Sequence, residues 1–106
     1  MKEKPNLDYI KQLAGDDSAF EKKFINILKE EFPQEKAEYL GNIKNNLPRE
    51  AALNVHKLKH KFNVLGLTKS YRFAVDYEES LRMADTSLQW EFLEILDIIE
   101  NYVKNI

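Results

Sequence analysis

Apolar residues recur at steps of three and four along nearly the whole chain, and this periodicity is typical of amphipathic helices. Phe20, Phe24, Leu28 and Phe32 form the clearest series. Glycine, proline and short polar runs interrupt the pattern and mark the ends of the segments. The pattern therefore predicts five helices, over residues 7–14, 18–45, 49–65, 68–84 and 87–105.

The connections between these helices are short, so consecutive long helices are expected to lie antiparallel. The prediction for residues 1–106 is one all-α domain, an antiparallel up-down-up-down four-helix bundle with a short extra N-terminal helix. Pro33 lies inside the second helix and is expected to kink or break it. Asp16, Asp17 and Ser18 are candidate N-caps of the same helix, and Glu21 lies three residues after Ser18, as in a capping box.

The composition agrees with a globular domain and excludes several classes of protein. Hydrophobic residues make up 43% of the chain, which is too many for an intrinsically disordered chain. There is no cysteine, which excludes a disulfide scaffold, a zinc ribbon and a thiol nucleophile. The charged start Met1–Pro5 precedes no apolar signal core, and no run reaches the ~18 apolar residues of a membrane span. We therefore expect a cytoplasmic protein without membrane contact.

The charge is unevenly distributed along the chain. The net charge is −2, yet residues 44–72 contain seven Lys and Arg residues against one acid, Glu50. Such a segment favours an anionic partner or ligand. A nucleic acid is the least favoured partner, because the segment has few aromatic residues and the whole chain is acidic.

The predicted helix over residues 49–65 carries the candidate chemistry. On a helical wheel its core stripe consists of Ala51, Val55, Leu58, Phe62 and Leu65. His56 lies about 140° from the middle of this stripe and is expected to face solvent. Lys59 and His60 follow it by one turn, and Ala52 and Leu53 precede it by one turn, so all four are expected beside it on the surface.

An exposed imidazole on a rigid helix suits a phosphoryl carrier. Neutral imidazole is a competent nucleophile near pH 7. Lys59 is expected to neutralise phosphate oxygens, and phosphoryl transfer needs mainly positioning and charge stabilisation. Leu53 and Val64 also point away from the stripe. They are expected to form an apolar docking patch beside the histidines, with coverage by the first helix as the alternative.

The residues around His56 resemble the core motif of histidine phosphotransfer (HPt) domains, the phosphoryl carriers of two-component phosphorelays. That motif is His-x-Leu-Lys-Gly with a second glycine ten residues after the histidine. Here His56, Leu58, Lys59 and Gly66 match in order and spacing, while His60 replaces the usual first glycine. The segments 7–10 and 77–81 and the phenylalanine series also resemble the family, so the resemblance covers almost the whole chain.

The resemblance implies that His56 takes a phosphoryl group from an aspartyl phosphate through its outer ring nitrogen and later returns it to another receiver. It implies a monomeric carrier without catalytic activity of its own, partnered by response-regulator receiver domains and a hybrid sensor histidine kinase. Mg²⁺ then belongs to the receiver, and no metal or cofactor is expected here. The implied phosphate neighbours are Lys59 and His60, the implied partner interface is Ala52, Leu53, Lys57, Asn63 and Val64, and the structural positions are Leu58 and Gly66.

Other interpretations remain open at this point. A degenerate HPt-like module that binds a receiver or kinase without phosphoryl transfer is the alternative function. His56 and His60 at i, i+4 can bind a metal, but the Glu of His-Glu-x-x-His is absent and nearby lysines repel cations. Glu78 and Glu79 diverge by about 100° and are expected to be surface charges or salt-bridge partners. Trp90 is expected in or near the core.

Overall fold

The computed structural model describes residues 3–106, and the first two residues of the charged start, Met1 and Lys2, lie outside the described residues. The predicted all-α class is confirmed, since the described range contains helices and no strand. None of these helices is both long and apolar enough to cross a membrane. The helices are α1 (Asp8–Ala14), α2 (Ser18–Lys44), α3 (Pro48–Val64), α4 (Thr68–Arg82) and α5 (Gln89–Lys104).

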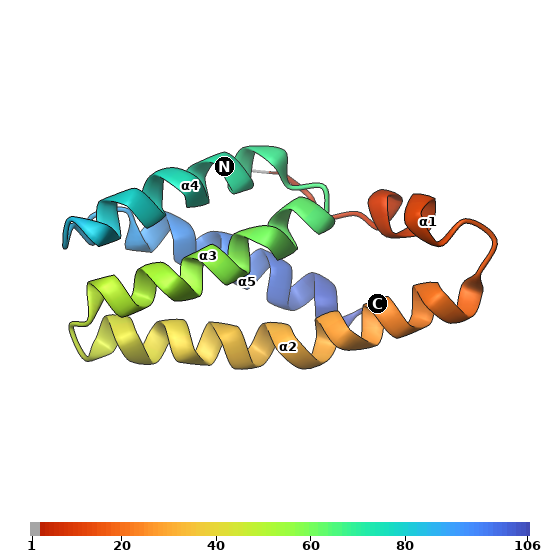
Figure 1. Ribbon diagram of the computed structural model, residues 1–106, viewed down its shortest axis with the longest axis horizontal. Helices are drawn as coiled ribbons and strands as arrows, with labels where there is room; N and C mark the ends of the chain where they lie inside the picture. Colours follow the sequence, from red (N-terminus) through yellow and green to blue (C-terminus); the bar gives the residue numbers. More distant parts are fainter. Residues whose placement is uncertain (1–2) are drawn as a thin grey trace.

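The helices form an elongated bundle that measures 45 × 23 × 19 Å (Figure 1). The helix α2 runs along its length and contacts both α3 and α5, while α4 contacts α3 and α5. The short α1 lies beside the N-terminal part of α2, beyond the end of α3. Because α3 packs between α2 and α4, only one side of α3 is left for solvent and for partners.

The buried side of α3 is the predicted core stripe. Its five side chains are fully buried, which confirms this prediction: Ala51, Val55, Leu58, Phe62 and Leu65. The rings of Tyr39, Tyr77 and Phe92 pack beside them, and the two tyrosine hydroxyls share a hydrogen bond of 2.6 Å. This packing fixes the rotation of α3, so the side chains opposite the stripe are held toward solvent.

Two local predictions were wrong, and a third is answered in part. Of the kink or break expected at Pro33, the break is absent, since α2 packs against other helices along its length and loses only one backbone donor there. Asp17, one of the three candidate N-caps, is confirmed in this role, since its side chain accepts a hydrogen bond from the N–H of Phe20 at 3.0 Å; the Ser18 capping box is not used. Trp90 is exposed, because it lies nearly opposite the buried Phe92 on α5.

The helix α3 ends at Gly66 as its sequence predicts. The N–H of Leu67 donates to the carbonyl of Phe62 at 2.9 Å, and the N–H of Gly66 donates to the carbonyl of Asn63 at 3.1 Å. These two bonds form a Schellman motif, which places a left-handed residue just after the helix. Gly66 has φ +76° and lies against the side chain of Asn6, so a Cβ atom there would lie 2.5 Å from its Nδ2.

Alanine at Gly66 is expected to lower the free energy of unfolding by about 1–3 kcal/mol, because it adds left-handed strain to the clash with Asn6. The matched control is Gly41→Ala. Gly41 lies inside α2 with no atom within 4 Å of an added Cβ, so alanine there is expected to stabilise by about 0.5–1 kcal/mol. Urea unfolding of the two variants checks the prediction, and equal effects would contradict it.

The N-terminal segment closes over the connection between α3 and α4. Glu3 accepts hydrogen bonds of 2.8 Å from the N–H groups of both Lys69 and Ser70, and one of 3.3 Å from the hydroxyl of Thr68. The first turn of α4 has no cap from its own N-cap residue, so Glu3 supplies one from a distant part of the sequence. Partial burial opposes ionisation, but these hydrogen bonds outweigh it and lower the pKa of Glu3.

Glutamine at Glu3 is expected to destabilise the fold by about 1 kcal/mol at neutral pH, because the cap loses its negative charge. The folded state lowers the pKa of this carboxyl, so the contribution is present above the ordinary Glu pKa of about 4.3 and is lost as the pH falls through the lowered value. Thermal unfolding of both proteins across this range is the measurement. A difference that stays constant down to about pH 2 contradicts the role of the charge.

Candidate functional site

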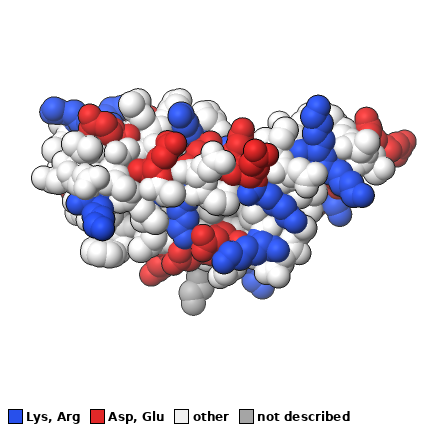
Figure 2. Space-filling view, turned by 90° about the horizontal axis from the view of Figure 1, so that it is seen from below, with Lys and Arg blue, Asp and Glu red and all other residues white. Residues whose placement is uncertain are grey.

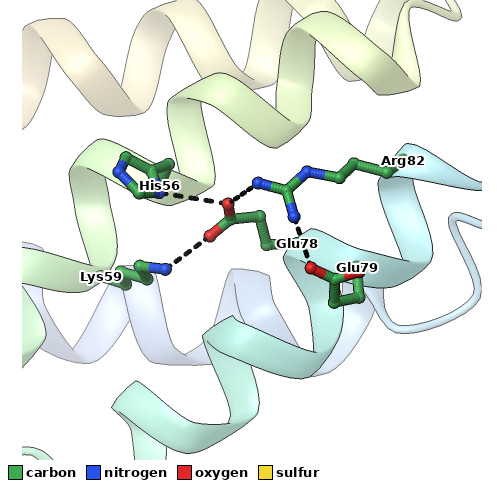
Figure 3. A network of polar contacts seen from close by, with 5 residues as sticks. All are labelled: His56, Lys59, Glu78, Glu79 and Arg82. Atoms are coloured by element: carbon green, nitrogen blue, oxygen red, sulfur yellow. Dashed lines mark hydrogen bonds and ion pairs between the residues drawn. The ribbon is translucent and has the colours of Figure 1, made fainter.

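The site is centred on His56, at the middle of the exposed side of α3. Its side chain is 53% exposed, which confirms the prediction that it faces solvent. One edge of the ring is nevertheless held in place, since Nδ1 lies 3.1 Å from Oε2 of Glu78 on α4 (Figure 3). The contact with Glu78 therefore fixes Nδ1, and the other ring nitrogen, Nε2, lies on the opposite edge of the ring.

Glu78 is the buried centre of the polar network in Figure 3. Only 3% of its side chain is exposed, and its two oxygens contact Nζ of Lys59 at 2.8 Å, Nδ1 of His56 and the guanidinium of Arg82. Burial opposes ionisation of this carboxyl, but the hydrogen bonds and charges of Lys59 and His56 together lower the pKa of Glu78. The carboxylate is therefore ionised at neutral pH.

This ionised carboxylate determines which ring nitrogen of His56 is reactive. A carboxylate has no proton to donate, so the hydrogen bond requires the proton to be on Nδ1 of His56. In the neutral form of the ring, the lone pair is then on Nε2, on the edge that faces away from Glu78. The contact with Glu78 therefore favours the tautomer whose outer nitrogen is available as a nucleophile.

Lys59 was predicted to lie on the surface beside His56, but its side chain is largely buried. Its side chain is only 12% exposed, and its Nζ bonds Glu78 and lies 6.0 Å from the centroid of the Tyr71 ring. The reason is that the ionised Glu78 attracts it toward α4. Arg82 reaches the same carboxylate from the next turn of α4 and also pairs with Glu79. Two cations therefore lie on the Nδ1 side of His56.

His60 lies on the opposite side of His56, toward α2. The two ring centroids are 5.1 Å apart and the ring planes meet at 86°, an edge-to-face arrangement. His60 also lines a largely apolar groove between α2 and α3, whose other lining residues are Phe24, Ile27, Leu28, Glu31, Lys61 and Val64. The groove therefore begins directly beside the candidate nucleophile.

The five residues predicted for the partner interface do not all lie on one surface. Leu53, Lys57 and Asn63 are exposed, and Val64 is half-buried in the groove. Ala52 is buried, so its predicted place on the surface is wrong. The physical reason is that α2 and α4 cover α3 from two sides, which makes its buried arc wider than the single stripe read from the sequence.

Two of the seven basic side chains of the segment 44–72 pair with acids in the folded chain. Lys61 lies 3.0 Å from Glu31 and 3.1 Å from Glu35 on α2, and Lys59 is paired with Glu78. Figure 2 shows basic and acidic side chains interspersed on the side of the molecule on which α2 lies. Lys59 and Lys61 therefore serve contacts between helices, which does not favour a nucleic-acid surface.

The sequence did not indicate Arg82 as part of the site, and it left Glu78 as one of two surface or salt-bridge acids. The signal available was the i, i+4 spacing of Glu78 and Arg82, which is typical of a helical ion pair. Their approach to His56 depends on the packing of α4 against α3. Within residues 3–106 no group of three or more His, Cys, Asp or Glu side chains is arranged to hold a metal ion.

Three comparisons with known proteins found no relative of this chain. No protein-family model matches the chain, and neither the curated proteins nor the solved structures give a match. The geometry of the site and the motif around His56 are therefore the observations that bear on function.

Proposed function

We propose that this chain is a phosphoryl carrier of the HPt kind, which receives the group on Nε2 of His56 from an aspartyl phosphate and passes it to a second acceptor. The observation that carries the proposal is the contact of 3.1 Å between Nδ1 of His56 and the buried Glu78. A half-exposed imidazole held in this tautomer presents a nucleophilic nitrogen to a partner without needing any further catalytic group.

The proposed transfer balances without the loss of a proton. The lone pair on Nε2 attacks phosphorus, the N–P bond forms, and the P–O bond to the donor aspartate breaks with its electron pair retained by the leaving carboxylate. The ring keeps its proton on Nδ1 and gains a positive charge, which the carboxylate of Glu78 stabilises. In the return step an acceptor carboxylate attacks phosphorus, and the N–P electron pair returns to Nε2.

The partner in this proposal is a receiver domain that supplies the acidic pocket and Mg²⁺, so the carrier itself needs no metal and has no activity alone. Leu53, Lys57, Asn63 and Val64 are proposed to contact it around His56. The antiparallel up-down-up-down topology with an added N-terminal helix, a monomeric state and a cytoplasmic location belong to the same proposal. A hybrid sensor kinase is the proposed source of the phosphoryl group.

The test is phosphoryl transfer from a panel of phosphorylated receiver domains to the intact chain, followed by mass spectrometry. The expected result is the gain of one acid-labile phosphoryl group, which tandem mass spectrometry assigns to His56. A phosphoryl group on another residue would overturn the assignment.

A second candidate function is an interaction module that binds a receiver or kinase without phosphoryl transfer. The observation that favours it is the apolar groove beside His60, which offers a docking surface whether or not His56 reacts. Binding of a receiver without any gain of phosphate, across the whole panel, would support this function and not the carrier.

A further inference from the structure

We infer that His60 binds the phosphoryl group on His56 as an imidazolium, so that the carrier takes up a proton together with the phosphoryl group. The inference rests on the proposed function and extends it to a side chain for which the HPt motif offers no role. His60 stands at a position where a glycine leaves the approach to the nucleophile open. A histidine there instead places a second titratable ring directly beside the reacting one.

The geometry directs His60 toward the incoming group. Helical side chains lean toward the N-terminus of their helix, so the ring of His60 leans back over His56, one turn earlier. Their centroids are 5.1 Å apart. Since Nδ1 of His56 is turned to Glu78 on α4, a phosphoryl group on Nε2 points away from α4. His60 lies on the α2 side of the same surface and therefore borders the space that the group enters.

Three of the nearby cations are already engaged with carboxylates. Lys59 and Arg82 both pair with Glu78, and Lys61 pairs with two acids on α2. Among residues 3–106, by contrast, the ring nitrogens of His60 form no hydrogen bond or ion pair. His60 is therefore able to turn an N–H toward a phosphate oxygen without breaking an existing contact.

Charged groups of both signs surround His60 before phosphorylation. They come from its own helix, from α2 and from α4: His56, Lys57, Lys59, Lys61, Glu31, Glu35, Glu78 and Arg82. A phosphoryl group adds about −1.5 to −2 charges within hydrogen-bond reach. This stabilises the protonated form of His60 relative to the neutral ring by roughly tenfold.

The expected pH dependence has a definite sign. At a pH where His60 is protonated in both the unphosphorylated and the phosphorylated chain, its imidazolium stabilises the phosphorylated chain fully. As the pH rises and His60 loses its proton even beside the phosphoryl group, this stabilisation is lost. Relative to a chain without the imidazole, the equilibrium constant for transfer onto His56 is therefore about tenfold larger near pH 5.5 than near pH 8.5.

The direct test uses phosphoramidate, a small donor that phosphorylates histidine without a receiver domain. The His60 ring is titrated by ¹⁵N NMR in the unphosphorylated chain and in the chain with phosphate mapped to His56. The expected result is an upward displacement of the His60 titration by about one pH unit. An unchanged titration, or preferential phosphorylation of His60 itself, would overturn the inference.

The second test separates this inference from the carrier function. Equilibrium transfer from a receiver is measured against pH for the wild type and for His60→Gln. If both accept phosphate with the same pH dependence, the carrier function holds and the role of His60 is wrong. If no receiver phosphorylates His56 while the NMR titration still moves after phosphoramidate treatment, the relay is wrong and the coupling between the two rings is supported.

Discussion

Glutamine in place of His56 is expected to abolish acid-labile phosphorylation by a phosphorylated receiver domain. Glutamine keeps a polar side chain that reaches toward Glu78, but it has no ring nitrogen with a nucleophilic lone pair. The fold is expected to survive, because this side chain is 53% exposed and contributes little to the core. The measurements are the intact mass at fixed times after mixing and thermal unfolding of the variant.

A matched control for His56→Gln is Lys44→Gln, which changes an exposed side chain at the end of α2, outside the site. It is expected to accept phosphate at the rate of the wild type. Continued acid-labile phosphorylation of His56→Gln would place the acceptor elsewhere and contradict the role of Nε2. Loss of phosphate uptake together with loss of the thermal transition would require the conservative variant His56→Asn before the role is judged.

The sequence was sufficient for the helices and for the exposure of His56, because both follow from short-range periodicity. The stripe that includes Val55, Leu58 and Phe62 identifies one side of α3 as the core whatever its neighbours are. The helix end at Gly66 was predictable for the same reason, since a Schellman motif involves only adjacent turns.

The site network was not predictable, because it depends on contacts between helices. His56 and Glu78 are 22 residues apart, and their contact depends on how α4 is rotated against α3. The wheel correctly indicated that Glu78 and Glu79 diverge. It gave no way to know that Glu78 is the one turned inward, with 3% of its side chain exposed, and Glu79 the one turned outward, with 66% exposed.

The positions of Lys59 and Ala52 also depend on contacts between helices and were not predictable from the sequence. A helical wheel places both near the solvent side of α3, but an ion pair with Glu78 draws Lys59 toward α4, and packing of two neighbouring helices buries Ala52. The cap that Glu3 provides to α4 joins residues 66 positions apart and has no signature in the local sequence. Such contacts are fixed by tertiary packing and not by periodicity.

Glutamine at Glu78 is expected to slow phosphoryl uptake by about ten- to a hundredfold, in the range found for partners that orient a reactive or metal-bound histidine. An ionised carboxylate accepts from both Lys59 and His56, whereas an amide has one oxygen for these two donors. If its NH₂ group faces Nδ1, the ring proton moves to Nε2 and occupies the lone pair that attacks phosphorus. The variant also loses the charge that stabilises the phosphorylated ring.

The matched control is Glu79→Gln, which removes the neighbouring carboxylate on the outward side of α4, where it pairs with Arg82. Its uptake rate is expected to stay within about twofold of the wild type, as for an exposed ion pair. Rapid mixing with a phosphorylated receiver gives the rates, and ¹⁵N NMR of the His56 ring gives the tautomer. If Glu78→Gln reacts as fast as Glu79→Gln and keeps its proton on Nδ1, Glu78 does not set the tautomer, and the proposal loses the observation on which it rests.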